Sequence, residues 1–199
     1  MNQKRSYKMR ERAKSQEETR QRIVEATMKL HEEVGPRATT ISAIAEKAGV
    51  QRLTVYRHFP DEAAVFQACT SHWLSLNPPP NPAEWADETD PREKLSKALS
   101  AFYRYYKATR RMWTVSFRDV ADVPALQGPM EEFEGFVASV AKDIAASFGS
   151  DENGQIAVTI KHAIVFPTWS DLDAQRLTND AKIDLVSKWL EGLVASDMN

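Results

Sequence analysis

The sequence predicts an all-α protein of about nine helices. Apolar residues recur with the i, i+3, i+4 spacing of one helix face, no segment alternates with the period of a strand, and Gly, Pro and capping residues separate the helical stretches. Four prolines between residues 78 and 82 interrupt the chain, because proline cannot continue a helix. Helices are expected at about residues 17–34, 41–48, 51–59, 61–76, 91–107, 109–119, 129–148, 153–169 and 179–195.

The segment 40–59 contains two short helices around a sharp turn. The first has one apolar face, formed by Ile41, Ile44, Ala45 and Ala48. Thr40 stands where a hydroxyl can cap the start of this helix, and Gly49 stands where a chain leaving a helix often needs positive φ. Val55 and Phe59, four residues apart, place the second helix against the first. This pattern predicts a helix-turn-helix motif.

The outer face of the second helix is predicted to bind DNA, because the second helix of such a motif enters the major groove. Arg52 can bond guanine O6 and N7 together, while Leu53 and Thr54 can contact the thymine methyl group. Phosphates suit Thr40, Gln51, Tyr56 and His58. The predicted DNA-binding set is Thr40, Gln51, Arg52, Leu53, Thr54, Tyr56, Arg57 and His58. A small helical hairpin with a solvated basic face is the alternative.

Several spaced elements of residues 17–66 resemble the DNA-binding domain of the TetR/AcrR family of transcriptional repressors. They are Thr19-Arg20, Ile23 and Ala26 in the first helix, Gly35, Ala38 to Ile41, Ile44-Ala45 and Ala48-Gly49-Val50 in the middle, and Val55-Tyr56-Arg57-His58-Phe59-Pro60 at the end. The resemblance implies a repressor that binds a palindromic operator as a homodimer. It also implies a C-terminal helical domain that holds a small inducer and forms the dimer interface.

The chain departs from the family pattern at two places. Gln51, Arg52 and Leu53 stand where the family usually has Ser-Lys-Gly, and the bulk of Leu53 replaces a glycine that lets the backbone approach DNA. After Pro60, Asp61 and Glu62 replace a lysine that commonly holds a phosphate. These acids suit a helix N-terminus but repel phosphate, so the operator sequence does not carry over from relatives.

Charge is distributed unevenly along the chain. The net charge of −2 conceals a net of +6 in residues 1–60, where 13 Lys and Arg face 7 Asp and Glu, and a net of −8 in the rest. Residues 1–16 are predicted to be a basic, disordered arm whose Lys4, Arg5, Lys8 and Arg10 follow DNA phosphates or enter a minor groove. A disordered start that only improves solubility is the alternative.

After this arm, the sequence predicts a helix-turn-helix domain at 17–60 and a helical ligand-binding and dimerisation domain at 61–199. The last helices are apolar over more than one stripe, so they need to bury two sides. The predicted dimer interface consists of Ile160, Ile164, Val186, Trp189, Leu190 and Leu193. A wholly internal core is the alternative.

Aromatic residues gather in the C-terminal part and allow a pocket for a small apolar or aromatic effector. The predicted lining is Phe102, Tyr106, Trp113, Phe117, Phe133, His162, Phe166 and Trp169. His162, on an otherwise apolar helix, is the polar contact in this hypothesis. A plain aromatic core, with His162 hydrogen-bonded inside it, explains the same pattern.

Enzyme chemistry finds little support in the sequence. The four histidines stand in different segments without a metal-binding partner at helix spacing, and no phosphate loop or Gly-x-Ser-x-Gly motif occurs. We therefore expect no catalytic residues, metal or cofactor. The lack of a long apolar segment or secretory signal, with Cys69 as the single cysteine, predicts a cytoplasmic protein without a membrane partner. A helical protein-interaction module and an enzyme with an unrecognised site remain the alternative functions.

Overall fold

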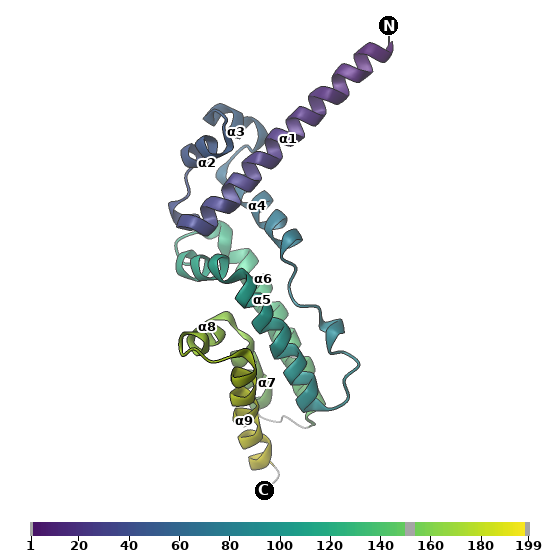
Figure 1. The fold of residues 1–199 in the computed structure, drawn as a ribbon, viewed down its shortest axis with the longest axis vertical. Coiled ribbons are helices and arrows are strands. Elements are labelled where there is room, and N and C mark those ends of the chain that lie inside the picture. The colour runs from purple at the N-terminus through teal and green to yellow at the C-terminus, as the bar shows by residue number, and fades with distance from the viewer. Residues whose placement is uncertain (1, 150–153, 198–199) are drawn as a thin grey trace. The chain divides into compact units, whose positions relative to one another are not determined.

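The computed structural model describes residues 2–149 and 154–197, which contain nine α-helices and two short 3₁₀ helices (Figure 1). The helices are α1 (Asn2–Val34), α2 (Ile41–Ala48), α3 (Arg52–His58), α4 (Glu62–Leu76), α5 (Pro91–Asp119), α6 (Pro124–Ser147), α7 (Gln155–Ile164), α8 (Phe166–Ala174) and α9 (Asn179–Asp197). The 3₁₀ helices are η1 (Pro36–Ala38) and η2 (Pro82–Glu84). The all-helical prediction is confirmed. Within the described ranges no helix is both long and apolar enough to cross a membrane.

The chain forms two compact units. We call residues 1–77 and 114–129 the recognition unit, and residues 78–113 and 130–199 the aromatic unit. The sequence instead predicts a boundary after residue 60. The structure divides the chain differently, since α4 packs against α1 and the end of α5 returns to the recognition unit.

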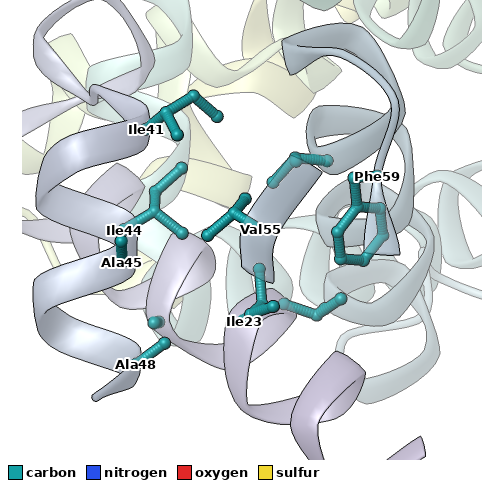
Figure 2. Close-up of a cluster of buried hydrophobic side chains, with 10 residues drawn as sticks. Ile23, Ile41, Ile44, Ala45, Ala48, Val55 and Phe59 are labelled. Atoms are coloured by element: carbon teal, nitrogen blue, oxygen red, sulfur yellow. The ribbon is translucent and has the colours of Figure 1, made fainter. Parts of the chain in front are cut away.

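The core of the recognition unit is aliphatic. In Figure 2, the labelled residues Ile23, Ile44 and Val55 converge from α1, α2 and α3. The full set of buried members is Ile23, Val24, Ala26, Ile41, Ile44, Ala45, Ala48, Val55, Phe59 and Val65. Such short side chains let the three helix backbones approach closely, which holds α3 in place.

The N-terminal arm differs from the sequence prediction. Residues 2–16, expected to be disordered, continue α1 as one helix from Asn2 to Val34. The segment has no Gly or Pro and is rich in Lys, Arg, Glu and Gln, which favour helix without needing burial. Lys14 and Glu18 also lie 4.0 Å apart, one turn along the same helix.

Three other helix boundaries also differ. The helices expected at 91–107 and 109–119 are one helix, because α5 has no Gly or Pro after Pro91. Helix α6 begins at Pro124, where a proline suits the first turn, and it continues through Pro129. The helix expected at 153–169 divides at Val165, whose backbone is extended, and Pro167 stands in the first turn of α8, which begins at Phe166.

Candidate DNA-binding surface

The turn between α2 and α3 has the geometry that its sequence predicts. The Thr40 hydroxyl accepts a hydrogen bond from the backbone N–H of Ala43 at 3.2 Å and so caps α2. Gly49 ends the helix in the left-handed region, with φ of 66°, and its N–H donates back to the last turn. Val50 N–H also bonds the Ala45 carbonyl at 2.9 Å. The turn angle is therefore set by hydrogen bonds at both ends of α2.

Helix α3 is anchored along one side only. Val55 is completely buried and Phe59 nearly so, while the guanidinium of Arg20 in α1 lies 4.9 Å from the centre of the Phe59 ring. A helix of seven residues has little stability alone, so this packing supplies its rigidity. The opposite side of α3 is left open to solvent.

The predicted DNA-binding residues lie at different depths on this surface. Six are exposed, namely Thr40, Gln51, Arg52, Leu53, Tyr56 and Arg57. Thr54 and His58 are half-buried, so they stand at the edge of the surface and not at its centre. Leu53 is the most prominent apolar side chain here, with 78% of its surface exposed.

The charges on this surface divide into two groups. Lys47 pairs with Glu33 at 2.7 Å, and Arg22 donates to the Ala48 carbonyl at 3.4 Å, so both cations hold α2 against α1. Arg52 and Arg57 have no hydrogen-bond or ion-pair partner among the described residues. Their guanidinium groups are therefore available to an anionic partner.

His58 does not add a third positive charge. Partial burial lowers its pKa first, and the positive charges of Arg57 and Arg20 lower it further. The ring is thus less readily protonated than a free histidine, and when neutral it can donate one hydrogen bond and accept another.

The structure describes the side chains of two of the four predicted arm residues. Lys8 and Arg10 lie exposed on the extension of α1, where they reach solvent. The side chains of Lys4 and Arg5 lie outside the described residues.

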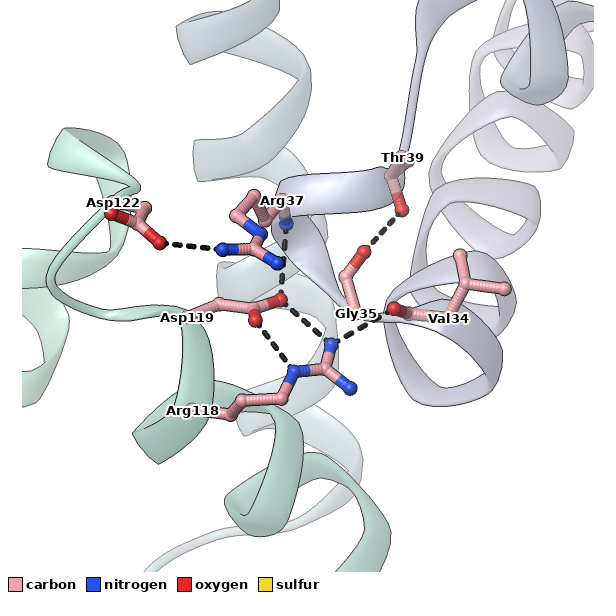
Figure 3. Close-up of polar contacts among 7 residues, drawn as sticks. All are labelled: Val34, Gly35, Arg37, Thr39, Arg118, Asp119 and Asp122. Carbon is pink, nitrogen blue, oxygen red and sulfur yellow. Dashed lines mark hydrogen bonds and ion pairs between the residues drawn. The ribbon is translucent and has the colours of Figure 1, made fainter.

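A polar network at the end of α1 was missed by the sequence analysis (Figure 3). The buried carboxylate of Asp119 accepts from the Arg37 backbone N–H at 3.1 Å and pairs with Arg118 at 2.7 Å. Arg118 also donates to the Val34 carbonyl at 2.9 Å, and Arg37 pairs with Asp122 at 2.8 Å. No local signal predicts the bonds of Arg37 and Val34 in this network, because their partners lie more than 80 residues away.

Gly35 is required at the centre of this network. Its φ is 93°, a conformation that side chains rarely adopt, and a Cβ there would collide with Arg118 and Asp119. The bond from Arg118, assisted by the Arg37 N–H, keeps the pKa of Asp119 below its ordinary value despite burial. The network therefore ties the segment before α2 to the end of α5.

The acidic residues after Pro60 have a structural role. The Asp61 carboxylate accepts from the Ala64 N–H at 2.8 Å and caps α4. Glu62 occupies the first turn of the same helix. Both acids therefore serve the N-terminal end of α4.

Six of the eight residues predicted to line an effector pocket lie close together. Phe102, Tyr106, Trp113, Phe133, Phe166 and Trp169 gather in the aromatic unit, with ring centres 4.5 to 6.4 Å apart. The other two residues lie outside this cluster. Phe117 is 39% exposed and belongs to the recognition unit, because α5 continues past residue 113. His162 is exposed, because α7 buries the neighbouring Ile160, Ala163 and Ile164 on its other side.

Two polar atoms in this cluster have no hydrogen-bond partner among the described residues. They are the Tyr106 hydroxyl and Trp169 Nε1, both on completely buried side chains. By contrast, the nearby Tyr103 hydroxyl donates to the Ala163 carbonyl at 3.0 Å. Burial also raises the pKa of Tyr106 well above its ordinary value, so its hydroxyl stays protonated.

Trp169 lies between two cations that the sequence analysis did not connect to it. The Arg110 Cζ is 5.1 Å and the Lys182 Nζ 5.3 Å from its ring centre. Asp173 forms ion pairs with both cations, and Lys182 is almost completely buried. Desolvation, followed by Arg110 and Lys107, lowers the pKa of Lys182.

Four of the six predicted dimer residues are buried within the chain itself. Ile160, Ile164, Val186 and Leu190 lie in the core of the aromatic unit, where α7 and α9 are in contact. Sequence periodicity cannot distinguish such an internal contact from an intermolecular one. Trp189 and Leu193 are half-buried on α9.

Comparisons with known proteins agree with this geometry. Residues 23–69 match the model for bacterial regulatory proteins of the tetR family. The HTH-type transcriptional regulator SrpR of Pseudomonas putida is 44% identical over 59 residues, which is 30% of this chain and 28% of SrpR. The matched region thus spans less than a third of that relative.

Solved structures resemble the chain over most of its length. A TetR-like regulator from Rhodococcus sp. RHA1 has a TM-score of 0.62 at 19% identity, covering 85% of this chain and 91% of that one. NalD of Pseudomonas aeruginosa has a TM-score of 0.56 at 24% identity, covering 87% and 94%. At these identities the likeness shows a shared fold.

The matched model and the matched relative both describe regulatory proteins. The matched segment contains the capped α2, the Gly49 turn and the exposed face of α3. The chain therefore contains a segment that matches the tetR family of bacterial regulatory proteins, and it has the fold of TetR-like regulators.

Proposed function

We propose that this regulator is a homodimeric repressor that binds a palindromic operator and is released by a small effector. The observation that carries the proposal is the exposed face of α3, on which Arg52 and Arg57 have no partner within the described chain. Arg52, at the start of α3, reads a guanine in the major groove. Tyr56, Thr40 and Gln51 bind phosphates and fix the position of the helix.

Dimerisation uses the outer side of α7 and α9. Val158 is 68% exposed on α7, and Leu185, Trp189 and Leu193 are half-buried on α9. The inner sides of these helices are already occupied by the internal core, so this second apolar side remains for a partner. Two copies joined here present two α3 helices to a palindromic site.

The effector binds the aromatic cluster. An unpaired buried hydroxyl costs about 1–3 kcal/mol, so the Tyr106 hydroxyl and Trp169 Nε1 favour a guest that accepts hydrogen bonds. The surrounding rings suit an apolar or aromatic body. NalD is a repressor of a multidrug efflux pump, and its likeness to this chain supports repression as the direction of control.

Coupling between the effector and DNA runs along α5. This helix carries Tyr106 in the aromatic cluster and Asp119 in the network at Gly35. An effector that prefers one of two arrangements of α5 shifts the population of DNA-competent dimers.

The test is a fluorescence-anisotropy titration against DNA from upstream of the protein's own gene and a scrambled duplex, at several salt concentrations. Tight binding to one duplex at two subunits per site, weakening steeply with salt, supports the proposal. If binding is equally weak to both, selection from genome fragments follows. Failure to recover any preferred fragment contradicts sequence-specific DNA binding and favours a protein-interaction module.

The dimer surface is tested by sedimentation equilibrium of Trp189→Asp and Lys188→Asp. Both variants place a carboxylate on α9, but Lys188 is exposed and lies outside the proposed surface. Trp189→Asp is expected to give monomers and Lys188→Asp dimers. A dimer that survives Trp189→Asp contradicts this interface.

A further inference from the structure

We propose that the recognition unit contains a second small-molecule site, separate from the aromatic cluster, for an uncharged and largely apolar compound that carries a hydrogen-bond acceptor. The site is a half-open cavity of about 390 Å³. It is lined by the end of α1, the start of α2, the start of α4 and residues 122–125, all of which belong to this unit. Its volume falls within the range of small-molecule sites.

The walls of the cavity are mainly apolar. Ile41 and Ile44 contribute from α2, Phe66 from α4 and Val123 from the segment before α6. The first three of these side chains are buried, so they form a fixed surface. An apolar body placed here gains free energy by leaving water.

His31 supplies the specific polar contact. Its side chain lines the cavity, is only 5% exposed and packs on the Phe66 ring at a centre distance of 5.0 Å. Its Nδ1 lies 3.6 Å from the Cys69 Sγ. Burial lowers the pKa of His31 to about 4 and raises the pKa of Cys69 to about 12, so both groups are neutral at pH 7.

The contact between the Cys69 thiol and His31 Nδ1 sets the ring tautomer. In the arrangement that we propose, the protonated thiol donates to Nδ1, which leaves the His31 proton on Nε2. Nε2 has no hydrogen-bond partner among the described residues. In this arrangement His31 offers the cavity an N–H donor that no protein group occupies.

Three of the other polar side chains around the cavity are already engaged. The Thr27 and Thr39 hydroxyls donate to the Ile23 and Gly35 carbonyls at 2.8 and 2.9 Å. The Arg37 guanidinium pairs with Asp122 at 2.8 Å. Because the Arg37 cation is paired, the Glu62 carboxylate also lines the wall and the His31 donor is neutral, the cavity suits a ketone or amide oxygen better than an anion.

The experiment uses acetophenone as the probe and ethylbenzene, which lacks the carbonyl, as its match. Long-range ¹H–¹⁵N spectra report the protonation of each His31 ring nitrogen during titration of the full chain without DNA. Acetophenone is expected to shift the Nε2 signal saturably and to bind about tenfold more tightly than ethylbenzene, as one hydrogen bond implies. Equal affinity for the two probes, or protonation at Nδ1, overturns the proposal.

Two variants locate the site. Ala63 is exposed and lines the cavity, so Ala63→Phe is expected to block the shift without disturbing the core, while Gln67→Phe, on the same helix but outside the cavity, keeps it. Ala125→Leu narrows the opposite wall and should give the same loss. Shifts confined to the Trp113 and Trp169 signals, or unchanged by Ala63→Phe, overturn the proposal. Since no DNA is used, this result is independent of the proposed function.

Discussion

The recognition unit and the aromatic unit are built from different kinds of core. In the recognition unit, Ile, Val and Ala make up nine of the ten members of the buried cluster, and Phe59 is the tenth. The aromatic unit also buries aliphatic residues, but it adds a cluster of Trp, Tyr and Phe. In this cluster the Tyr106 ring has four ring neighbours within 6 Å: Tyr105, Trp113, Phe166 and Trp169. Aliphatic packing sets helix spacing closely, whereas large rings leave polar atoms without partners.

This difference matches what each unit has to do. A DNA-reading helix needs a fixed position, and Val55 and Phe59 give α3 that position. An effector site gains from groups that become satisfied only when a guest arrives, as the Tyr106 hydroxyl does. The following predictions test two consequences of this difference. The recognition unit should be rigid, and the aromatic unit should contain buried polar atoms without hydrogen-bond partners.

The largest effect is expected from Val55→Asp. A carboxylate at this completely buried position has no partner, so the recognition unit should lose about 4 kcal/mol or more and unfold. Leu53→Asp places the same charge on the exposed face of α3, two residues before Val55, and should leave the fold unchanged. Circular dichroism during urea unfolding measures both, and equal stability of the two variants would disprove the proposed packing of α3.

The second prediction concerns pH. Burial holds the pKa of His31 at about 4, below its unfolded value of 6.5, while the Asp119 charge opposes this shift. The unfolded chain therefore binds the proton first, and stability is lost as pH falls from about 6.5 toward 4. Between pH 6.5 and 5 the loss is about 2 kcal/mol.

Urea unfolding of the wild type and His31→Gln at both pH values measures this loss. The variant removes the titrating ring, so it should show a smaller decrease at pH 5. An equal decrease in the two proteins would assign the acid sensitivity to other groups.

A smaller effect is expected from the network at Gly35. Asp119→Asn weakens the bonds to Arg118 and to the Arg37 N–H in a buried place, and should cost about 2 kcal/mol. Asp122→Asn affects only an exposed pair with Arg37 and should cost less than about 0.5 kcal/mol. Thermal unfolding of the two variants measures the difference between their stabilities. Equal stability of Asp119→Asn and Asp122→Asn would mean that the network does not hold the segment before α2.

The smallest effect is expected in the aromatic unit. Tyr106→Phe removes a buried hydroxyl that has no partner, so the free protein should become more stable by about 1 kcal/mol. Tyr103→Phe is the matched control, because its hydroxyl donates to the Ala163 carbonyl and its loss should destabilise the fold. Destabilisation by Tyr106→Phe would mean that its hydroxyl is already satisfied.

The recognition unit was the more predictable of the two from sequence. Thr40, Gly49 and Val55 act through neighbours within a few residues, so the helix-turn-helix was visible in the spacing alone. The sequence indicated the effector cluster only through its many aromatic residues. It could not show that His162 is exposed, because tertiary packing decides that α7 buries Ile160 instead.

Distant contacts explain the remaining differences. Helix α9 packs against α7, and this contact decides which side of α9 is buried. Because the sequence does not show the contact, Val186 and Leu190 resembled interface residues. The bond between Asp119 and the Arg37 N–H joins parts of the chain 82 residues apart. No local pattern contains information about such pairs.

The most direct test of the account is the affinity of wild type, Arg52→Ala and Tyr56→Phe for the selected operator and its single-base-pair variants. Arg52→Ala is predicted to reduce discrimination at one guanine position by about 1–3 kcal/mol, whereas Tyr56→Phe weakens binding to all duplexes alike. Loss of the same selectivity in both variants, or unchanged discrimination in Arg52→Ala, would contradict the assignment of α3 as the helix that reads DNA.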